Sequence, residues 1–321
     1  MKLTTRKIAA EAGTSPATVS RYLNGTVSVS DELAERIERA VRELGGSVMR
    51  RNPEKYVFVL LTHLRFAFYR QALKNLLAEK SPYQIILIHY DPDSAETIKN
   101  YAQFFKPVGV IYFEEEIDDG ILSCLQGKGI RTIMLGGIAP NSGSEMVRVN
   151  DLAAAYEGTN YLLRLGHRKI LFLSDEVKKI SAGFQRITGC RQALEESGLV
   201  LDTDHVYYRD VTFQAGYDAV SEALQKGVEF SAVFAFSDEL AVGAMAALYD
   251  QGINVPKDVS VLGFDDLEIA KRVRPSLTTI HQPVDLFVKK ALDLLGDPSL
   301  APRTEILLPY TIIERDSCKP V

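Results

Sequence analysis

The apolar positions of this chain follow two different patterns, and the change between them comes near residue 56. Before that point they recur at the spacing of helices, as Ile8, Ala9 and Ala12 do. After it, near-continuous apolar runs such as YVFVLLTH alternate with amphipathic stretches. Such runs are typical of strands buried on both faces of a parallel sheet. The pattern therefore predicts a small all-α unit followed by an α/β core.

Strands and helices alternate twice within the predicted core, which indicates two lobes. The runs YVFVLLTH, YQIILIHY, VGVIYF and RTIMLG predict the strands of one doubly wound parallel sheet. After a helix predicted at 152–164, the runs KILFLS, HVYYRD, AVFAFS and VSVLGFDD predict a second such sheet. Open α/β sheets bind ligands beyond the carboxyl ends of their strands, so a ligand is expected in a cleft between the lobes.

The first 24 residues predict two short helices joined by a tight turn, the helix-turn-helix that lays its second helix in the DNA major groove. Gly13 supplies the turn, Ser15 caps the second helix, and Pro16 occupies its first position. Arg21 can bond a guanine edge bidentately, whereas the neighbouring hydroxyls suit phosphate contacts. The residues expected at the DNA are Thr4, Thr5, Pro16, Ala17, Thr18, Ser20, Arg21 and Asn24, with Arg50 and Arg51 further on. The alternative is a small helical hairpin without a role in DNA binding.

The charge of the chain is divided unevenly. The whole chain carries −5, but residues 1–52 contain nine Lys/Arg and six Asp/Glu, so they carry +3 and the rest carries −8. A basic unit on an acidic body orients a protein on DNA and limits non-specific binding. The division also fits an ordinary solvated surface, so it supports the DNA-binding interpretation without establishing it.

The N-terminal pattern A-x-x-A-G-x-S-x-x-T-V-S-R-x-L-N resembles the headpiece of the lactose-repressor/galactose-repressor family of bacterial regulators. The resemblance continues through the core, most densely in VPKDVSVLGFDDLEIAKRVRPSLTTIHQP. It implies a core like the periplasmic sugar-binding proteins, in which the chain crosses three times between two lobes. It also implies a cytoplasmic transcription regulator, a repressor, that binds a two-fold DNA operator as a homodimer.

The resemblance sets expected domain limits and exposes one departure. Family members have a short helix between headpiece and core that contains A-R-x-L, which is missing from GSVMRRNPEK, and Pro53 cannot lie inside a helix. A shortened linker is therefore expected, with Met49 as the one apolar side chain suited to the minor groove. The expected parts are a headpiece at 1–46, a linker at 47–55 and a core at 56–321, divided into lobe 1 (about 56–164 and 282–309) and lobe 2 (about 165–281 and 310–318).

Two residues are the strongest candidates for contact with an effector. Arg186 begins a helix, where a cation is disfavoured, and the family's matching arginine bonds ligand hydroxyls or carboxylates. The alternative for Arg186 is a surface salt bridge. Asp265 follows a buried strand directly and can accept hydrogen bonds from sugar hydroxyls. Its alternative is to cap the next helix, a role that Asp266 can fill instead.

Further candidates come from the resemblance and from residue type. Ser237 occupies a position where the family often has a ligand-contacting Asn or Ser, while Asp238 is expected to cap the following helix. Phe213 can stack on a sugar face. Asn150 is a candidate because the dipeptide Asn150-Asp151 stands where the family usually has Asp-Asn, although the order is reversed here. Phe68 follows the first core strand and suits either the cleft or the core.

Signatures of other classes are missing from the sequence. It contains no phosphate-binding G-x-x-x-x-G-K-[ST], no G-x-S-x-G and no H-E-x-x-H, so neither an enzyme nor a cofactor is expected. Its five His and three Cys lack metal-ligand spacing, and no apolar run approaches a membrane span. The expected effector is a small sugar or sugar derivative. The alternative is a regulator of the catabolite-control type, driven by a protein partner without a small molecule.

Overall fold

The computed structural model of the 321-residue chain separates into two compact units, and the division along the chain falls between Lys55 and Tyr56. The structure describes residues 4–23, 29–45, 55–62, 66–113, 117–138, 142–175, 181–297 and 304–321. Several predictions therefore lie outside the described residues: the DNA contacts of Asn24, Arg50 and Arg51, the roles of Met49 and Pro53, and nearly all of the linker.

The N-terminal unit contains three helices: α1 (Thr5–Ala12), α2 (Pro16–Leu23) and α3 (Asp31–Glu43). Gly13 ends α1 with φ 61°, the left-handed conformation that a turn at this point requires. Val19 and Ile37 are fully buried and join the apolar face of α1 in a small core. The apolar residues that recur at helical spacing in the sequence are therefore the residues of this core.

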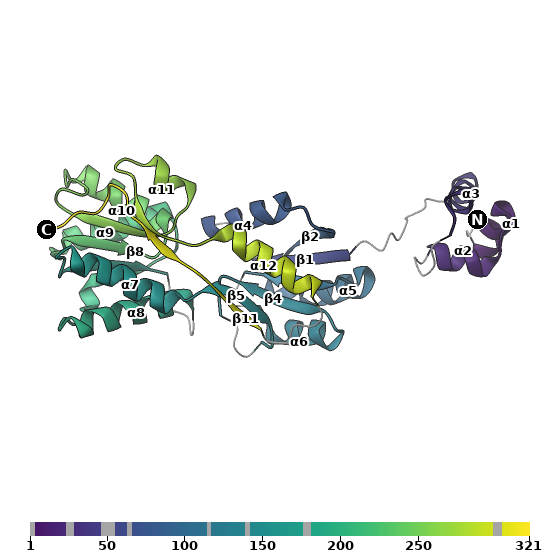
Figure 1. The fold of residues 1–321 in the computed structure, drawn as a ribbon, viewed down its shortest axis with the longest axis horizontal. Helices are drawn as coiled ribbons and strands as arrows, with labels where there is room; N and C mark the ends of the chain where they lie inside the picture. Colours follow the sequence, from purple (N-terminus) through teal and green to yellow (C-terminus); the bar gives the residue numbers. More distant parts are fainter. Residues whose placement is uncertain are drawn as a thin grey trace. The chain divides into compact units, whose positions relative to one another are not determined.

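The first lobe is a six-stranded sheet with the order β11-β5-β4-β3-β1-β2 and helices over both faces (Figure 1). The pairs β1–β3, β3–β4, β4–β5 and β5–β11 are parallel. Its strands are β1 (Lys55–Leu61), β2 (Tyr83–His89), β3 (Gly109–Tyr112), β4 (Arg131–Leu135), β5 (Glu145–Val149) and β11 (Glu305–Leu308). Its helices are α4 (Ala67–Ala78), η1 (Pro92–Ser94), α5 (Ala95–Phe105), α6 (Asp119–Gly127) and α12 (Val284–Gly296).

The second lobe repeats this plan in the order β12-β10-β9-β8-β6-β7. Every pair is parallel except β10–β12, which is antiparallel. Its strands are β6 (Ile170–Ser174), β7 (Val206–Tyr208), β8 (Ala232–Ala235), β9 (Ser260–Asp265), β10 (Thr278–His281) and β12 (Thr311–Ile313). Its helices are α7 (Asp151–Arg164), α8 (Ala182–Glu196), η2 (Thr203–His205), α9 (Phe213–Gln225), α10 (Asp238–Asp250) and α11 (Glu268–Arg272).

Strand β6 of the second lobe is apolar along almost its whole length because both faces of the sheet are covered there. Along β6, Leu171 and Leu173 belong to the core beneath α9 and α10. Ile170 and Phe172, which alternate with them, belong to the core beneath α7 and α8. This alternation is the two-residue period of a strand, with apolar residues on both sides of the sheet.

The chain passes between the lobes three times, between β5 and α7, between β10 and α12, and between β11 and β12. The first passage differs from the expected lobe boundary near residue 164. Ala154, Ala155 and Leu162 of α7 lie in one core with Phe172 of the second lobe. The predicted boundary was wrong by the length of this helix, because its apolar face packs on α8 and the second sheet.

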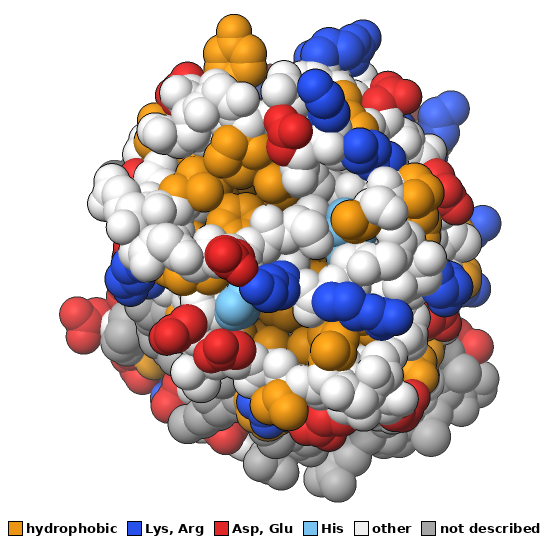
Figure 2. Space-filling model, turned by 90° about the vertical axis from the view of Figure 1, so that its left-hand side faces the viewer, with side chains coloured by type: hydrophobic (Ala, Val, Ile, Leu, Met, Phe, Trp, Pro, Cys, Tyr) orange, Lys and Arg blue, Asp and Glu red, His pale blue; other side chains and the backbone are white. Residues whose placement is uncertain are grey.

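Within the described ranges, no helix is long and apolar enough to cross a membrane. On the face that Figure 2 presents, Lys and Arg side chains lie interspersed with Asp and Glu, rather than gathered by sign.

Candidate ligand cleft and DNA-binding helices

The second helix of the N-terminal unit has the cap that its sequence predicts. Ser15 Oγ accepts a hydrogen bond from the backbone N–H of Thr18 at 3.0 Å, which satisfies one of the first free amides of α2. Tyr22 Oη donates to Glu38 Oε1 at 2.7 Å and fixes α2 against α3. Thr4 is at the N-cap of α1, but its side chain makes no cap hydrogen bond among the described residues.

One side of α2 is left for solvent or for DNA. Val19 is fully buried, whereas Pro16, Ala17 and Arg21 are exposed. Among the other predicted DNA contacts, Thr4 and Thr5 are exposed, and Thr18 and Ser20 are partly buried. The helix-turn-helix therefore presents the predicted residue types on its outer side, which is the side that a recognition helix offers to a major groove.

A cavity of about 110 Å³ lies between the two lobes of the core. The first lobe contributes the aromatic residues Phe66, Phe68 and Tyr69. The second lobe contributes polar groups at the carboxyl ends of its strands, among them Asp265, which ends β9. Ser237, which follows β8 by two residues, also lines the cavity. The location agrees with the ligand position expected for open parallel sheets.

Arg186 lines this cavity, but its hydrogen bonds are made to the protein. Nε and Nη2 each lie 2.8 Å from Oδ1 of Asp151, and Nη1 donates to the backbone oxygen of Phe236. The guanidinium carbon is 3.7 Å from the centroid of the Phe264 ring. Asp151 is completely buried, and burial raises the pKa of its carboxyl while Arg186 opposes that rise. Arg186 therefore forms a buried ion pair rather than the surface salt bridge that was the alternative, and it also lines the cavity where contact with a ligand was predicted.

Asp265 has an unusual backbone conformation at the edge of the cavity. Its φ is 116° and that of Asp266 is 59°, so two successive non-glycine residues lie in the positive-φ region. Oδ1 of Asp265 accepts a hydrogen bond from Nε2 of Gln282 at 2.7 Å, in the second passage between the lobes. Burial raises the pKa of Asp265 to about 7, although Arg186 and the Gln282 hydrogen bond act in the opposite direction.

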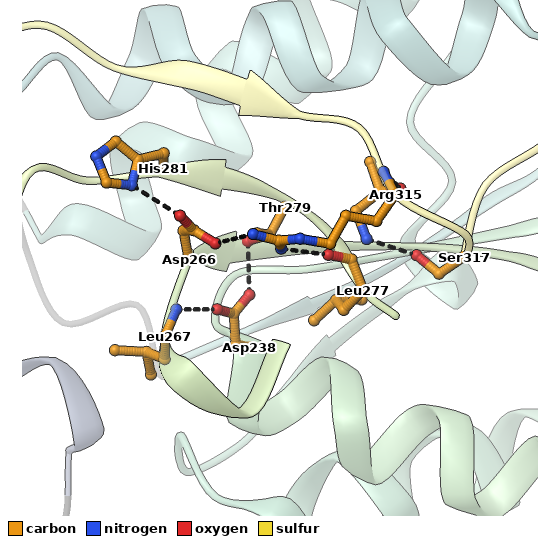
Figure 3. A network of polar contacts seen from close by, with 9 residues as sticks. Asp238, Asp266, Leu267, Leu277, Thr279, His281, Arg315 and Ser317 are labelled. Atoms are coloured by element: carbon orange, nitrogen blue, oxygen red, sulfur yellow. Dashed lines mark hydrogen bonds and ion pairs between the residues drawn. The ribbon is translucent and has the colours of Figure 1, made fainter. Parts of the chain in front are cut away.

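Figure 3 shows where Asp238 and Asp266 point. The hydrogen bonds of this region correct two expectations, that Asp238 caps α10 and that Asp266 can cap the next helix. Ser237, not Asp238, caps α10, since its Oγ accepts from the N–H of Leu240 at 3.1 Å. Asp238 is completely buried and accepts from Leu267 N–H and Thr279 Oγ1, each at 2.6 Å (Figure 3). Burial, reinforced by the nearby Asp265, raises the pKa of Asp238 well above its usual range.

Asp266 does not cap a helix either. The residue at the N-cap of α11 is Leu267, which makes no side-chain cap hydrogen bond among the described residues. Instead Asp266 pairs with Arg315, and its Oδ2 lies 3.0 Å from Nδ1 of His281 (Figure 3). Asp265 and Asp266 therefore face different surroundings: Asp265 faces the cavity, and Asp266 faces the carboxyl end of β10 and the C-terminal segment.

The remaining predicted cleft residues are divided. Phe68 lines the cavity and also packs edge-on against Phe287 with ring centroids 5.3 Å apart, so it serves both cleft and core. Phe213 is 45% exposed and begins α9, and it is not among the described residues that line the cavity. Asn150 caps α7 by accepting from the N–H of Ala153 at 3.1 Å, because its extended backbone directs the side chain along the helix. It does not line the cavity either.

Two charged residues of the cavity were not predicted from the sequence. Asp175 follows β6 directly, in the same relation to its strand that singled out Asp265, so the signal was present in LSDE. Glu239 lines the cavity from the first turn of α10 and pairs with Arg70 of α4 at 2.6 Å. That pair joins residues 169 positions apart, and no local sequence pattern indicates it.

A helix-turn-helix unit joined to a two-lobed core of this type defines a class of transcriptional regulators. Residues 4–45 match the description of bacterial regulatory proteins of the lacI family, and residues 159–318 match that of the periplasmic binding protein-like domain. The chain belongs to the lacI family of bacterial transcriptional regulators, whose members are not enzymes.

Relatives and solved structures resemble the chain over nearly its whole length. It is 28% identical to the HTH-type transcriptional regulator RegA of Clostridium saccharobutylicum, with 99% of both chains covered. It is 26% identical to catabolite control protein A of Priestia megaterium, over 99% of this chain and 100% of that relative. A solved complex of the transcriptional regulator CelR with cellobiose matches with 28% identity and a TM-score of 0.74, covering 98% of this chain and 100% of that one.

Proposed function

We propose that this protein is a transcriptional repressor that binds a two-fold operator as a homodimer and responds to a small sugar or sugar derivative in the cavity between its lobes. Helix-turn-helix proteins bind paired half-sites as dimers, which supports the two-fold operator. A ligand that contacts both lobes favours one arrangement of the lobes, and that preference is the source of control over DNA binding. Such a regulator works in the cytoplasm, where its operator is.

The observation that carries this proposal is the Asp265 carboxylate in a cavity walled by aromatic rings. Carboxylate oxygens accept hydrogen bonds from sugar hydroxyls, and aromatic rings pack against the C–H faces of a sugar. The rings come from the first lobe and Asp265 from the second, so one ligand contacts both. The cellobiose in the CelR complex supports a sugar as the class of ligand.

The test is calorimetric titration of the purified protein with pentoses, hexoses, their amino derivatives and cellobiose, followed by operator binding with and without the sugar that binds. Asp265→Asn is expected to weaken binding of that sugar at least about tenfold, since a hydrogen bond to a charged group contributes about 1.5–3 kcal/mol. Asp204→Asn, at an exposed position in η2, is the control. A protein that binds none of these sugars, or an Asp265→Asn variant with wild-type affinity, would reject the proposal.

The second candidate is a regulator of the catabolite-control type, whose core is driven by a protein partner without a small molecule. The similarity to catabolite control protein A over nearly the whole chain favours it. The same titrations separate the two candidates. A sugar that binds in the cavity and changes operator affinity rejects the partner-driven alternative.

A further inference from the structure

A second carboxylate, Asp175, has a defined place in the cavity. It lies at the end of β6 and lines the cavity together with Arg186 and Asp265. A Cβ on Gly183 would lie 1.7 Å from Asp175 Oδ1, so the carboxylate rests against the first turn of α8 where only a glycine leaves room. The first turn of a helix favours a negative charge. The local structure therefore accommodates Asp175 as an anion at the cavity.

The only guanidinium among the described cavity residues makes its ion pair with Asp151 and not with Asp175, although its charge opposes the rise in the pKa of Asp175. Arg186 directs its nitrogens at Asp151 and at the oxygen of Phe236, so its charge compensates a carboxylate behind the cavity. Oδ2 of Asp151 is buried and has no hydrogen-bond partner among the described residues, so even that carboxylate is incompletely satisfied. Within the described part of the chain, neither Asp175 nor Asp265 has a cation at ion-pair distance.

Two buried carboxylates that make no ion pair among the described residues carry a cost of desolvation. Burial raises the pKa of both Asp175 and Asp265, which expresses that cost. A neutral sugar donates hydroxyl hydrogen bonds but leaves the net charge unchanged. An ammonium group supplies three donors and a compensating charge, and charge-assisted hydrogen bonds are roughly twice as strong as neutral ones. Two lysines, Lys178 and Lys179, follow Asp175 closely in the sequence, but they belong to residues 176–180, which lie outside the described residues.

We propose that the effector is an amino sugar, that Asp175 binds its protonated amine, and that Asp265 accepts hydrogen bonds from its hydroxyls. This inference rests on the proposed function, which requires only that a sugar binds. Asp175 is then the residue that determines specificity for a cationic ligand over its neutral counterpart. The aromatic side chains of the first lobe contact the ring itself.

The test compares D-glucosamine, D-galactosamine and D-mannosamine with the parent hexoses and the N-acetyl derivatives by calorimetric titration at pH 7. N-acetylation removes the charge and keeps the nitrogen, so it isolates the ammonium group. At least one amine is expected to bind tenfold or more tightly than both of its neutral counterparts. A neutral hexose that binds as tightly as its amine overturns this inference and leaves the proposed function standing. If no sugar of either kind binds, the proposed function fails as well.

Two variants test the residue. Asp175→Asn keeps the shape of the side chain and is expected to weaken binding of the amine tenfold or more. The affinity for the neutral sugar is expected to change less than about threefold, a difference of at least about 0.7 kcal/mol in specificity. Gly183→Ala is expected to act in the same direction, because the new Cβ displaces the Asp175 carboxylate without changing any charge.

Matched controls are available for both variants. Glu195→Gln removes an exposed carboxylate from the same helix, α8, and Gly127→Ala adds a methyl group with nothing within 4 Å. Both controls are expected to bind the amine as the wild type does, and thermal unfolding followed by circular dichroism verifies that all four variants are folded. An Asp175→Asn variant that retains the preference for the amine overturns the assignment.

Discussion

Nη2 of Arg70 and Oε1 of Glu239 lie 2.6 Å apart, and this ion pair joins α4 of the first lobe to α10 of the second. The two side chains are 46% and 22% exposed, so solvent screens their attraction. Glu239 also lines the cavity, which places the pair beside the ligand. A contact of this kind favours the arrangement in which the lobes approach each other.

Removal of this pair is expected to weaken binding of the effector modestly. Glu239→Gln should reduce affinity by no more than about fivefold, since exposed ion pairs contribute about 0–1 kcal/mol. A double-mutant cycle with Arg70→Met, followed by calorimetry, measures the interaction directly. Strictly additive effects would show that the pair does not couple the lobes. A loss beyond about tenfold for Glu239→Gln would show that Glu239 contacts the ligand itself.

Loss of the Arg186 guanidinium is expected to destabilise the core strongly. Arg186→Met leaves Asp151 buried without its partner, and breaking a buried pair costs about 3–5 kcal/mol. The double variant Arg186→Met/Asp151→Asn should recover much of that loss, because the uncompensated charge is gone. Urea unfolding of the two variants provides the measurement. If Arg186→Met keeps wild-type stability and loses only ligand affinity, the arginine is chiefly a ligand donor.

The stability of the core is expected to fall as the pH rises from about 4 to about 7. The pKa of Asp265 is raised to about 7 in the folded protein, against about 3.9 in an unfolded chain, so the folded state binds the extra proton within that window. Each proton retained by the folded state contributes a slope of about 1.4 kcal/mol per pH unit. Asp265→Asn should flatten the slope in urea unfolding between pH 5 and 7, and Asp204→Asn should not. Equal slopes for Asp265→Asn and wild type would contradict the raised pKa.

Arg21 is expected to contribute to sequence recognition. Arg21→Ala should cost about 1–3 kcal/mol at the specific operator and relax the preference at one base pair of each half-site. The comparison variant is Arg39→Ala, which removes the same charge from the exposed side of α3. Operators selected from random DNA and gel-shift titrations supply the measurement. If Arg21→Ala weakens specific and random DNA equally, Arg21 contacts phosphate only.

Local sequence rules correctly predicted the features that depend on residues close together in the chain. The turn at Gly13 and the cap at Ser15 follow from residue type and position, and both were predicted. The central strands β1, β3, β4, β6, β8 and β9 were recognisable because each is largely buried on two faces. Asp265 was found because it directly follows such a strand, and the same rule would have found Asp175.

The errors concern contacts between residues far apart in the chain. Asp238 was expected to cap α10, but Ser237 does so, because Asp238 is held by Leu267 in the turn after β9 and by Thr279 in β10. The lobe to which α7 belongs depends on how its apolar face packs against α8, which spacing alone does not specify. The buried pair of Arg186 with Asp151 likewise joins two helices 35 positions apart.

The passage from β11 to β12 has a consequence for synthesis of the chain. The two strands, separated only by Pro309 and Tyr310, complete the edges of both sheets. A ribosome makes the helix-turn-helix well before these strands. Neither lobe has all of its strands until the same few residues have emerged, so the two halves of the sensor are finished together.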